Sequence, residues 1–342
     1  MKRILVGLSG GVDSTYGVSL LQQAGYTVEG AVLRMHSYTD TAAALESAGA
    51  LGIPCRIIDC EEAFAASVVQ NFIAEYRQGR TPNPCIICNP TVKFRLLYET
   101  AMAEGFDGIA TGHYAAVRRI EDRFCIARAA DASKDQSYML YRLTQPILEK
   151  LILPLAQMAK TQVVAAASGL HLLAADRAES QEICFIRNEK YTDFLTRVAG
   201  AEKEGWFVDA EGHRLGRHHG ISHYTVGQRK GLGISGESRL FVKRIDPESG
   251  DILLSAAKED PTERFWLQNV VWQGETEPDD GLYDVMLRYR APLCKAHVRK
   301  EGQGLCVTLE QPAKAVTPGQ SAVLYRNDCV QFGGVIRLEN KA

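Results

Sequence analysis

The chain has 342 residues, of which 46% are hydrophobic, and this content is enough for two or three domains with cores of their own. A formal net charge of −2 excludes a bulk polycation, so any contact with a nucleic acid has to come from local patches. No stretch approaches the roughly 18 apolar residues of a membrane span. The first strand begins almost at Met1, without room for a signal peptide. With nine cysteines, we therefore expect a soluble cytoplasmic protein with reduced thiols.

A phosphate-binding loop is predicted near the N-terminus. The apolar run 4–6 is typical of a buried strand, and Tyr16 and Leu20 follow at helical spacing. Between them lies the segment Leu8-Ser9-Gly10-Gly11-Val12-Asp13-Ser14, whose backbone N–H groups would converge as a phosphate requires. Two glycines allow close approach, the serine hydroxyls can donate, and Asp13 could hold Mg²⁺ against the same phosphates. The alternative is an ordinary turn rich in small residues.

Strands and helices alternate up to about residue 115. Strands are predicted over 26–33, 55–58 and 107–111, and helices over 41–51, 61–78 and 91–104. This alternation predicts an α/β domain with a doubly wound parallel sheet, whose ligands bind at the carboxyl ends of the strands. The glycine-rich loop, Leu33 and the segment 111–113 all follow such ends, so we expect them to share one crevice, with Leu33 beside an adenine.

The rest of the chain predicts two β-rich domains. Residues from about 145 to 200 are mostly helical in pattern, and from Lys203 short β-type runs replace the helices. We expect domains at 1–200, 203–263 and 265–342, the second small and β-rich and the last a closed antiparallel barrel with strands near 284–289 and 306–309. From Tyr283 onward, nine Lys or Arg stand against five Asp or Glu, a modest excess that by itself is typical of a solvated surface.

The segment Thr81-Pro-Asn-Pro-Cys-Ile-Ile-Cys-Asn89 carries two cysteines in a loop that its prolines stiffen. We expect the following helix to start near Thr91. Cys88 would then lie close to the positive end of that helix, which lowers a thiol pKa and strengthens the nucleophile. A half-site for zinc, a redox dithiol or two packed cysteines are the alternatives.

Three further stretches are rich in functional side chains. The segment 179–186 holds Cys184 between apolar residues, where a core role is the alternative. The segment 134–138 is a polar cluster before a helix, and surface solvation explains it equally well. The segment 223–233 combines glycine turns, an aromatic ring and two cations, a combination that suits contact with an RNA backbone.

Six motifs in this order resemble the tRNA-specific 2-thiouridylases, a family of PP-loop enzymes that cleave ATP between the α and β phosphates: SGGVDS, TPNPCIICN, ATGHYA, KDQSY, SQEICFI and HYTVGQRKGLG. The resemblance runs from residue 3 to about 335, and the tail segments 287–290 and 318–325 also fit. It implies that ATP adenylates the C2 carbonyl oxygen of the wobble uridine in tRNA. A sulfur nucleophile then displaces AMP to give 2-thiouridine.

The resemblance also implies roles for individual residues. The ATP site would comprise Gly7, Leu8, Ser9, Gly10, Gly11, Val12, Asp13, Ser14, Leu33 and Gly112. Contacts to tRNA would come from Asn83, Pro84 and Cys85 beside the target base and from His113, Lys134, Asp135, Gln136, Arg288, Tyr289 and Gln320 elsewhere. Cys88 matches the nucleophile. Cys184 matches the residue that receives persulfide sulfur from a partner, either a cysteine desulfurase or a relay protein.

The chain departs from the family at Cys85, where the family usually has Asp. Cys85, Cys88 and the distant Cys184 could then hold three irons of a [4Fe–4S] cluster, with the fourth iron open to sulfide. Two sulfur routes are therefore open: a persulfide on Cys184 and Cys88, or this cluster. The presence of three cysteines at one expected site slightly favours the cluster. The segment after Leu33 is also shorter than in the family and reads Arg-Met-His-Ser.

Two other functions compete with thiolation. Another ATP pyrophosphatase, such as an amidating synthetase for a small molecule, would explain the glycine-rich loop but not the cysteines. A non-catalytic RNA-binding or iron–sulfur protein would explain the cysteines but not the loop. For the thiolation hypothesis we expect ATP and Mg²⁺ as cofactors, tRNA and a sulfur donor as partners, and a monomer.

Overall fold

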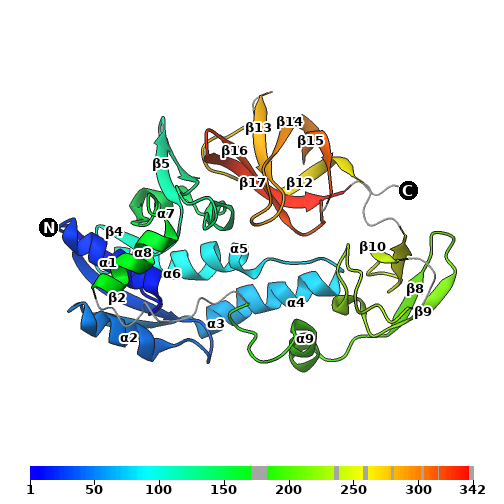
Figure 1. The fold of residues 1–342 in the computed structure, drawn as a ribbon, viewed down its shortest axis with the longest axis horizontal. Helices are drawn as coiled ribbons and strands as arrows, with labels where there is room; N and C mark the ends of the chain where they lie inside the picture. Colours follow the sequence, from blue (N-terminus) through cyan, green and yellow to red (C-terminus); the bar gives the residue numbers. More distant parts are fainter. Residues whose placement is uncertain are drawn as a thin grey trace.

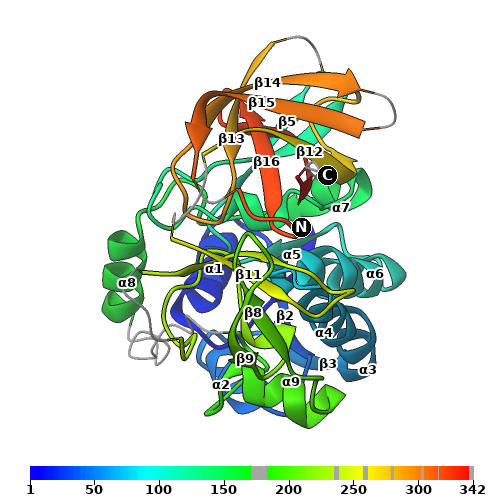
Figure 2. The same ribbon diagram turned by 90° about the vertical axis from the view of Figure 1, so that its right-hand side faces the viewer.

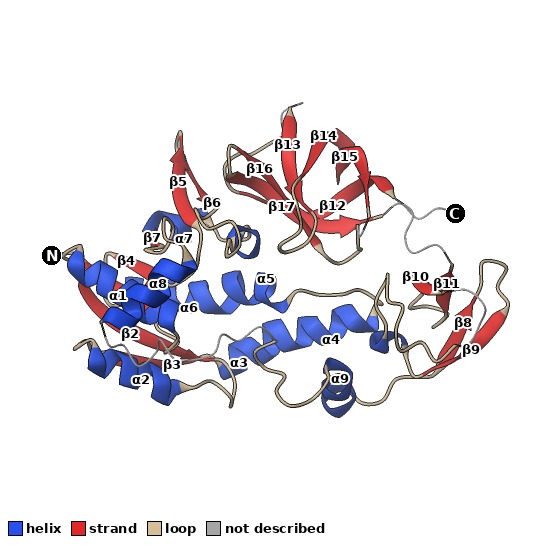
Figure 3. Cartoon of the chain, in the orientation of Figure 1, coloured by secondary structure: helices blue, strands red, loops and turns tan. Residues whose placement is uncertain are grey.

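Three sheets organise the chain in the computed structural model, which describes residues 1–170, 183–234, 239–256, 261–278, 281–301, 304–314 and 316–338. The N-terminal domain, the small central domain and the C-terminal barrel follow one another along the chain (Figure 1), and Figure 3 shows that strands dominate the last two. No helix in these ranges is long and apolar enough to cross a membrane.

A five-stranded parallel sheet forms the centre of the N-terminal domain, in the order β3-β2-β1-β4-β7. Its strands are β1 (Arg3–Gly7), β2 (Thr27–Arg34), β3 (Cys55–Asp59), β4 (Gly108–Thr111) and β7 (Leu151–Ile152). Helices α1 (Val12–Gln23) and α2 (Thr41–Ala50) connect the first three strands. The predicted doubly wound α/β domain is confirmed. Strands β1 to β4 begin and end within one or two residues of the expected ranges, whereas β7 was not predicted.

Two long helices cross the domain beside this sheet, and each contains a π-helical turn. The first runs through α3 (Glu61–Phe64), the π-turn η1 (Ala65–Val69) and α4 (Gln70–Arg77). The second runs through α5 (Pro84–Cys88), the π-turn η2 (Asn89–Lys93) and α6 (Phe94–Ala103). Single π-turns inside helices are common at functional sites, and η2 directly follows Cys88.

The expected start of the second helix near Thr91 was wrong. The helix begins at Pro84, because the Asn83 side chain caps it by accepting a hydrogen bond from the Cys85 N–H at 3.2 Å. Pro84 occupies the first turn, where its missing N–H costs nothing and its fixed φ suits a helix. The prolines therefore initiate the helix seven residues early, and both cysteines lie on it.

The remaining elements of the N-terminal domain include a hairpin that the sequence did not predict. Strands β5 (Ala116–Ile120) and β6 (Arg123–Ala127) pair with each other outside the parallel sheet. Strand β6 also pairs with the barrel through Ala127 and Cys329. The 3₁₀ turn η3 (Ser137–Leu140) and the helices α7 (Gln145–Lys150), α8 (Lys160–Gly169) and α9 (Tyr191–Ala199) follow. The expected helical pattern over 145–200 is present in the described part, and residues 171–182 lie outside it.

The central domain is a small sheet in the order β10-β11-β8-β9. Its strands are β8 (Gly205–Val208), β9 (Arg214–His218), β10 (Phe241–Ile245) and β11 (Ile252–Ser255), with the 3₁₀ turn η5 (Ile221–His223) before β10. Phe207, Val242 and Ile252 are each almost fully buried and form its core. The β-rich character expected of this region is confirmed.

The C-terminal domain is a closed six-stranded antiparallel barrel, as predicted. The strands are β12 (Thr262–Trp272), β13 (Leu282–Met286), β14 (Cys294–Glu301), β15 (Gly304–Ala313), β16 (Ser321–Arg326) and β17 (Cys329–Arg337). Closure occurs because β12 pairs with both β15 and β17. The strand expected over 284–289 ends earlier, at Met286, because residues 287–290 form a turn in which Arg290 has a φ of 62°.

The barrel packs against the N-terminal domain over the long helices (Figure 2). The Tyr138 hydroxyl donates to the Ser321 carbonyl oxygen at 2.9 Å, and the Tyr141 hydroxyl lies 3.1 Å from Ser321 Oγ. The Gln320 amide donates to the Thr81 carbonyl oxygen. One apolar cluster contains residues of both domains, so the barrel is fixed beside the segment that precedes Cys85.

Candidate nucleotide and thiolation site

The loop between β1 and α1 has the geometry of a phosphate cradle. Gly10 has a φ of 75°, and a Cβ there would lie 2.6 Å from the carbonyl carbon of Ala43 on α2. Gly11 is the N-cap of α1 and has no side chain to cap the first N–H groups of the helix. The Ser9 and Ser14 hydroxyls lie 3.1 Å apart beside these groups. The loop therefore fits the phosphates of a nucleotide.

Gly112 brings the end of β4 directly against this loop. A Cβ at Gly112 would lie 2.6 Å from the backbone nitrogen of Ser14 and 2.7 Å from the carbonyl carbon of Asp13. Only a residue without a side chain allows this approach. The structure thus gathers all predicted nucleotide residues at the carboxyl ends of β1, β2 and β4, with Leu33 buried at the end of β2.

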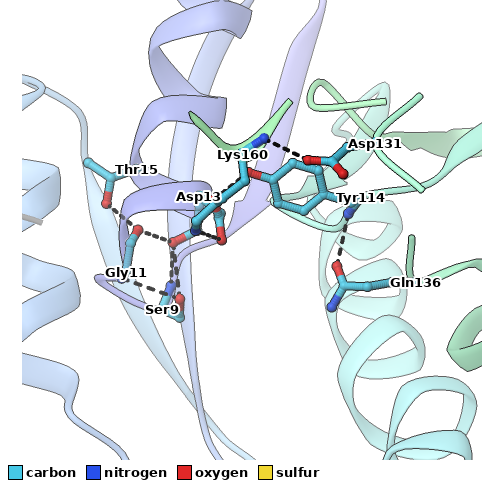
Figure 4. A network of polar contacts seen from close by, with 9 residues as sticks. Ser9, Gly11, Asp13, Thr15, Tyr114, Asp131, Gln136 and Lys160 are labelled. Atoms are coloured by element: carbon cyan, nitrogen blue, oxygen red, sulfur yellow. Dashed lines mark hydrogen bonds and ion pairs between the residues drawn. The ribbon is translucent and has the colours of Figure 1, made fainter. Parts of the chain in front are cut away.

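Asp13 has two partners that the sequence analysis did not include. The Lys160 ammonium lies 2.7 Å from each of its carboxylate oxygens, and the Tyr114 hydroxyl donates to Oδ1 at 2.7 Å (Figure 4). Tyr114 lies next to the predicted residue His113. Lys160 is the first residue of α8, where a cation opposes the positive end of the helix. This unfavourable position of a lysine is the feature of the sequence that could have pointed to a functional role of Lys160.

The two helix cysteines occupy different environments. Cys85 is exposed in the first turn of α5, whereas Cys88 is buried and its sulfur lies 3.7 Å from Met35 Sδ. Burial raises the pKa of Cys88 to about 12, although the charge of Lys93 acts in the opposite direction. The expected lowering of this pKa was wrong, because the positive end of the helix lies at Cys85 and Cys88 is enclosed by side chains.

Cys184 approaches the same place from a different segment. The next residue, Phe185, anchors this segment by edge-on contacts with Phe64, Phe72 and Phe194 at centroid distances of 5.5, 5.4 and 5.3 Å. Phe185 and Ile186 belong to the apolar cluster that contains Cys88, and Cys184 itself is exposed. Although the residue as a whole is exposed, partial desolvation of its thiol and the nearby Cys85 both raise the pKa of Cys184. Residues 179–182 of the predicted motif lie outside the described residues.

The side chains that could bind a metal near the start of α5 are the thiols of Cys85, Cys88 and Cys184. Their sulfur atoms are not all within 4.8 Å of one another, so they do not form a compact site for a single ion. Within the described ranges, such a compact group is formed by Asp209, Glu211 and His213 in the central domain. A [4Fe–4S] cluster is larger than one ion and takes soft thiolate ligands, so the chemistry of this donor set is compatible with it.

Most of the residues of the N-terminal domain that are predicted to contact tRNA form hydrogen bonds with other residues of the chain. His113 Nδ1 lies 2.9 Å from Thr111 Oγ1, and burial lowers the pKa of this imidazole well below its usual value. The Asp135 side chain is 3% exposed and accepts hydrogen bonds from Ala129 N and from Ser137. Gln136 bonds the Tyr114 backbone, and Lys134 is half-buried. These side chains stabilise the turn that carries Tyr114, and their contact with tRNA stays a prediction.

Other predicted tRNA residues surround the cysteine helix. Asn83 and Pro84 form its first turn, and Gln320 reaches them from the barrel through Thr81. Arg288 is exposed on the barrel, and Tyr289 lies half-buried with its ring 6.2 Å from that of Tyr138. Contact of these residues and of Cys85 with tRNA stays a prediction.

Family models match the chain along almost its whole length. Residues 2–188 match the model described as tRNA methyl transferase HUP domain, residues 192–256 the tRNA methyl transferase PRC-barrel domain, and residues 262–336 the Aminomethyltransferase beta-barrel domain. A protein named tRNA-specific 2-thiouridylase from Lachnoclostridium phytofermentans is 38% identical over 98% of this chain and 99% of its own length. The chain belongs to the tRNA-specific 2-thiouridylase family.

Other relatives of the family show the same extent of similarity. The 2-thiouridylase of Desulforamulus reducens is 39% identical over 98% of this chain and 97% of its own length. Among solved structures, a 4-thiouridine synthetase–RNA complex with bound ATP covers 57% of this chain and 50% of its own, with 17% identity and a TM-score of 0.38. A similarity at that level supports no argument about function.

Proposed function

We propose that the chain is an ATP-dependent tRNA-uridine 2-sulfurtransferase that activates the C2 carbonyl of the wobble uridine and replaces its oxygen with sulfur. The names of its full-length relatives, tRNA-specific 2-thiouridylases, support this proposal. One observation carries it: the phosphate cradle and the three thiols adjoin at one edge of the parallel sheet. Leu33 at the end of β2 belongs to the same apolar cluster as Cys88, and Met35 contacts the Cys88 sulfur.

The first half of this reaction takes place at the cradle. The backbone N–H groups around Gly10 and Gly11 would bind the phosphates, and Asp13 would hold Mg²⁺, which neutralises phosphate charge. The uridine oxygen attacks the α phosphorus, and pyrophosphate leaves with the electron pair of the broken bond. Adenylation converts a poor oxygen leaving group into AMP, which sulfur then displaces.

For the sulfur we favour three cysteines acting together as ligands. Cys85, Cys88 and Cys184 converge from two segments, and Cys85 stands where the family usually has Asp. A [4Fe–4S] cluster on these thiolates would offer sulfide to the activated base. The alternative is a persulfide received by Cys184 from a donor protein and released by attack of Cys88. Only the cluster route requires Cys85.

Iron and acid-labile sulfide analysis of oxygen-free protein separates the two routes. We expect iron and sulfide in the wild type, their loss in Cys85→Ser, and loss of thiolation with them. Cys294→Ser is the matched control, because Cys294 is a half-buried cysteine on the barrel strand β14. Full thiolation by Cys85→Ser, or active protein without iron, would establish the persulfide route instead.

Exposed basic side chains on the barrel support the proposal that the partner is an RNA. Strand β14 exposes Lys295, Arg299 and Lys300, which are suited to the phosphates of an RNA backbone. In this scheme residues 1–200 adenylate and thiolate, residues 203–263 form a tRNA-contacting linker domain, and residues 265–342 bind tRNA. A cytoplasmic location and a monomer are part of the same hypothesis.

Nucleotide turnover tests the function as a whole. We expect conversion of ATP to AMP and pyrophosphate that requires tRNA with a wobble uridine, and 2-thiouridine in the product when sulfur is supplied. Turnover with a small amine or carboxylate in place of tRNA would identify an amidating synthetase. Binding of tRNA without AMP release would identify a non-catalytic protein.

A further inference from the structure

A lysine from a distant part of the chain lies at the nucleotide loop. Lys160 begins α8, and its backbone N–H donates to Asp131 Oδ2 at 2.9 Å, which fixes the start of the helix. Its side chain is 14% exposed and extends to the Asp13 carboxylate, 2.7 Å from both oxygens. Figure 4 shows Lys160 and Tyr114 meeting at Asp13 beside Ser9 and Gly11.

The proposed function gives Asp13 a second cation to bind. Mg²⁺ takes carboxylate oxygens at close range, and its repulsion of an ammonium on the same carboxylate favours moving the ammonium to another anion. A lysine has a flexible four-carbon stem, so its ammonium can move while its backbone stays fixed by Asp131. The nearest anions that nucleotide binding would supply are the phosphates above Ser9 to Ser14.

We propose that Lys160 is the pyrophosphate-binding cation of this site, held by Asp13 when no nucleotide is bound and transferred to the β and γ phosphates when Mg·ATP enters. This inference rests on the proposed function and adds a residue to its adenylation step. In that step a bond forms between the uridine oxygen and the α phosphorus, and the bond from the α phosphorus to the bridging oxygen breaks. The electron pair leaves on pyrophosphate, and the Lys160 ammonium stabilises that charge.

The test compares ATP with AMP, which lacks the pyrophosphate. In tRNA-free protein, calorimetry should show that Lys160→Met binds Mg·ATP about 10- to 100-fold more weakly than wild type, because a hydrogen bond between charged groups is lost. AMP binding should stay unchanged. With tRNA and saturating ATP, AMP formation should fall by about 10²–10³-fold, as for the loss of one donor to a transition state. Lys160→Arg should restore most ATP affinity, since it keeps the charge.

Lys150→Met is the matched control, because Lys150 ends α7 on the surface and its ammonium lies 3.6 Å from the carboxylate of its neighbour Glu149. Wild-type ATP affinity in Lys160→Met would overturn the inference, as would an equal loss of ATP and AMP binding, which marks a purely structural lysine. If the methionine variant does not fold, Lys160→Gln replaces it under the same criteria. A wild type that binds ATP but never releases AMP with tRNA would contradict the proposed function and leave the binding comparison intact.

Discussion

Substitution of Gly112 by Ala should weaken ATP binding although it changes no residue of the loop 8–14. Gly112 has no positive φ, so an alanine is compatible with its backbone and the effect is purely one of space. The added Cβ would lie 2.6 Å from the Ser14 nitrogen, whereas ordinary contact begins at 3.4 Å, so β4 and the start of α1 must separate by about 0.8 Å. All three nearest atoms belong to the backbone of Asp13 and Ser14, which cannot rotate away.

The size of the effect follows from this displacement. Overpacking of this kind costs about 1–3 kcal/mol. If that cost falls on the loop, ATP affinity drops by about 5- to 150-fold. Misplacement of reacting groups by about 1 Å can cost a further 10²-fold in rate, so AMP formation should suffer more than binding.

Calorimetric titration with Mg·ATP and a tRNA-dependent AMP assay measure the two effects. Gly49→Ala is the matched control, because Gly49 lies in α2 and a Cβ there meets no atom within 4 Å. That variant should bind ATP normally and be stabilised by about 0.4–1 kcal/mol. Wild-type ATP affinity in Gly112→Ala, in a protein with normal thermal unfolding, would refute the steric reasoning.

Three further outcomes are expected. Tyr114→Phe removes the hydroxyl that donates to Asp13, so Mg·ATP binding in calorimetry should weaken by only about 2- to 13-fold, the effect of one neutral hydrogen bond. Phe185→Ala opens the aromatic contacts behind Cys184, so urea unfolding should show a loss of about 3–5 kcal/mol, and iron content should fall under the cluster route. In metal-free protein, iodoacetamide should label exposed Cys85 before buried Cys88, as read by peptide mass spectrometry. Because the pKa of Cys88 is raised to about 12, its thiolate fraction and labelling rate should still be rising tenfold per pH unit near pH 9; a plateau there would contradict the raised pKa.

The sequence was sufficient to predict the features that depend on local patterns. Apolar runs and their spacing gave the parallel sheet and its helices, and the change to short β-type runs near Lys203 gave the two later domains. The glycines at 10 and 11 indicated a tight turn between a strand and a helix, and that turn lies between β1 and α1, with Gly10 at a φ of 75°. These features need no knowledge of which distant residues meet.

Features that depend on distant contacts or on burial could not be predicted. Lys160 meets Asp13 across 147 positions of the chain, and no periodicity encodes such a pair. The β5–β6 hairpin pairs locally and was missed, and its contact with Cys329 of another domain could not be predicted. The thiol pKa of Cys88 was predicted with the wrong sign, because the helix start and the surrounding apolar cluster were both unknown.

One short turn couples the two halves of the site. Gly112 presses against the backbone of Asp13 and Ser14, and the next residue, His113, packs against Phe94 at a centroid distance of 5.3 Å on the cysteine helix. The charge of Lys93, which ends η2, acts on His113 as well as on Cys88 and Cys184. The nucleotide loop and the helix that carries Cys85 and Cys88 are therefore in contact with two adjacent residues. The π-turn η2 lies between Cys88 and Phe94, so the irregular part of that helix separates the cysteines from the residue that His113 contacts.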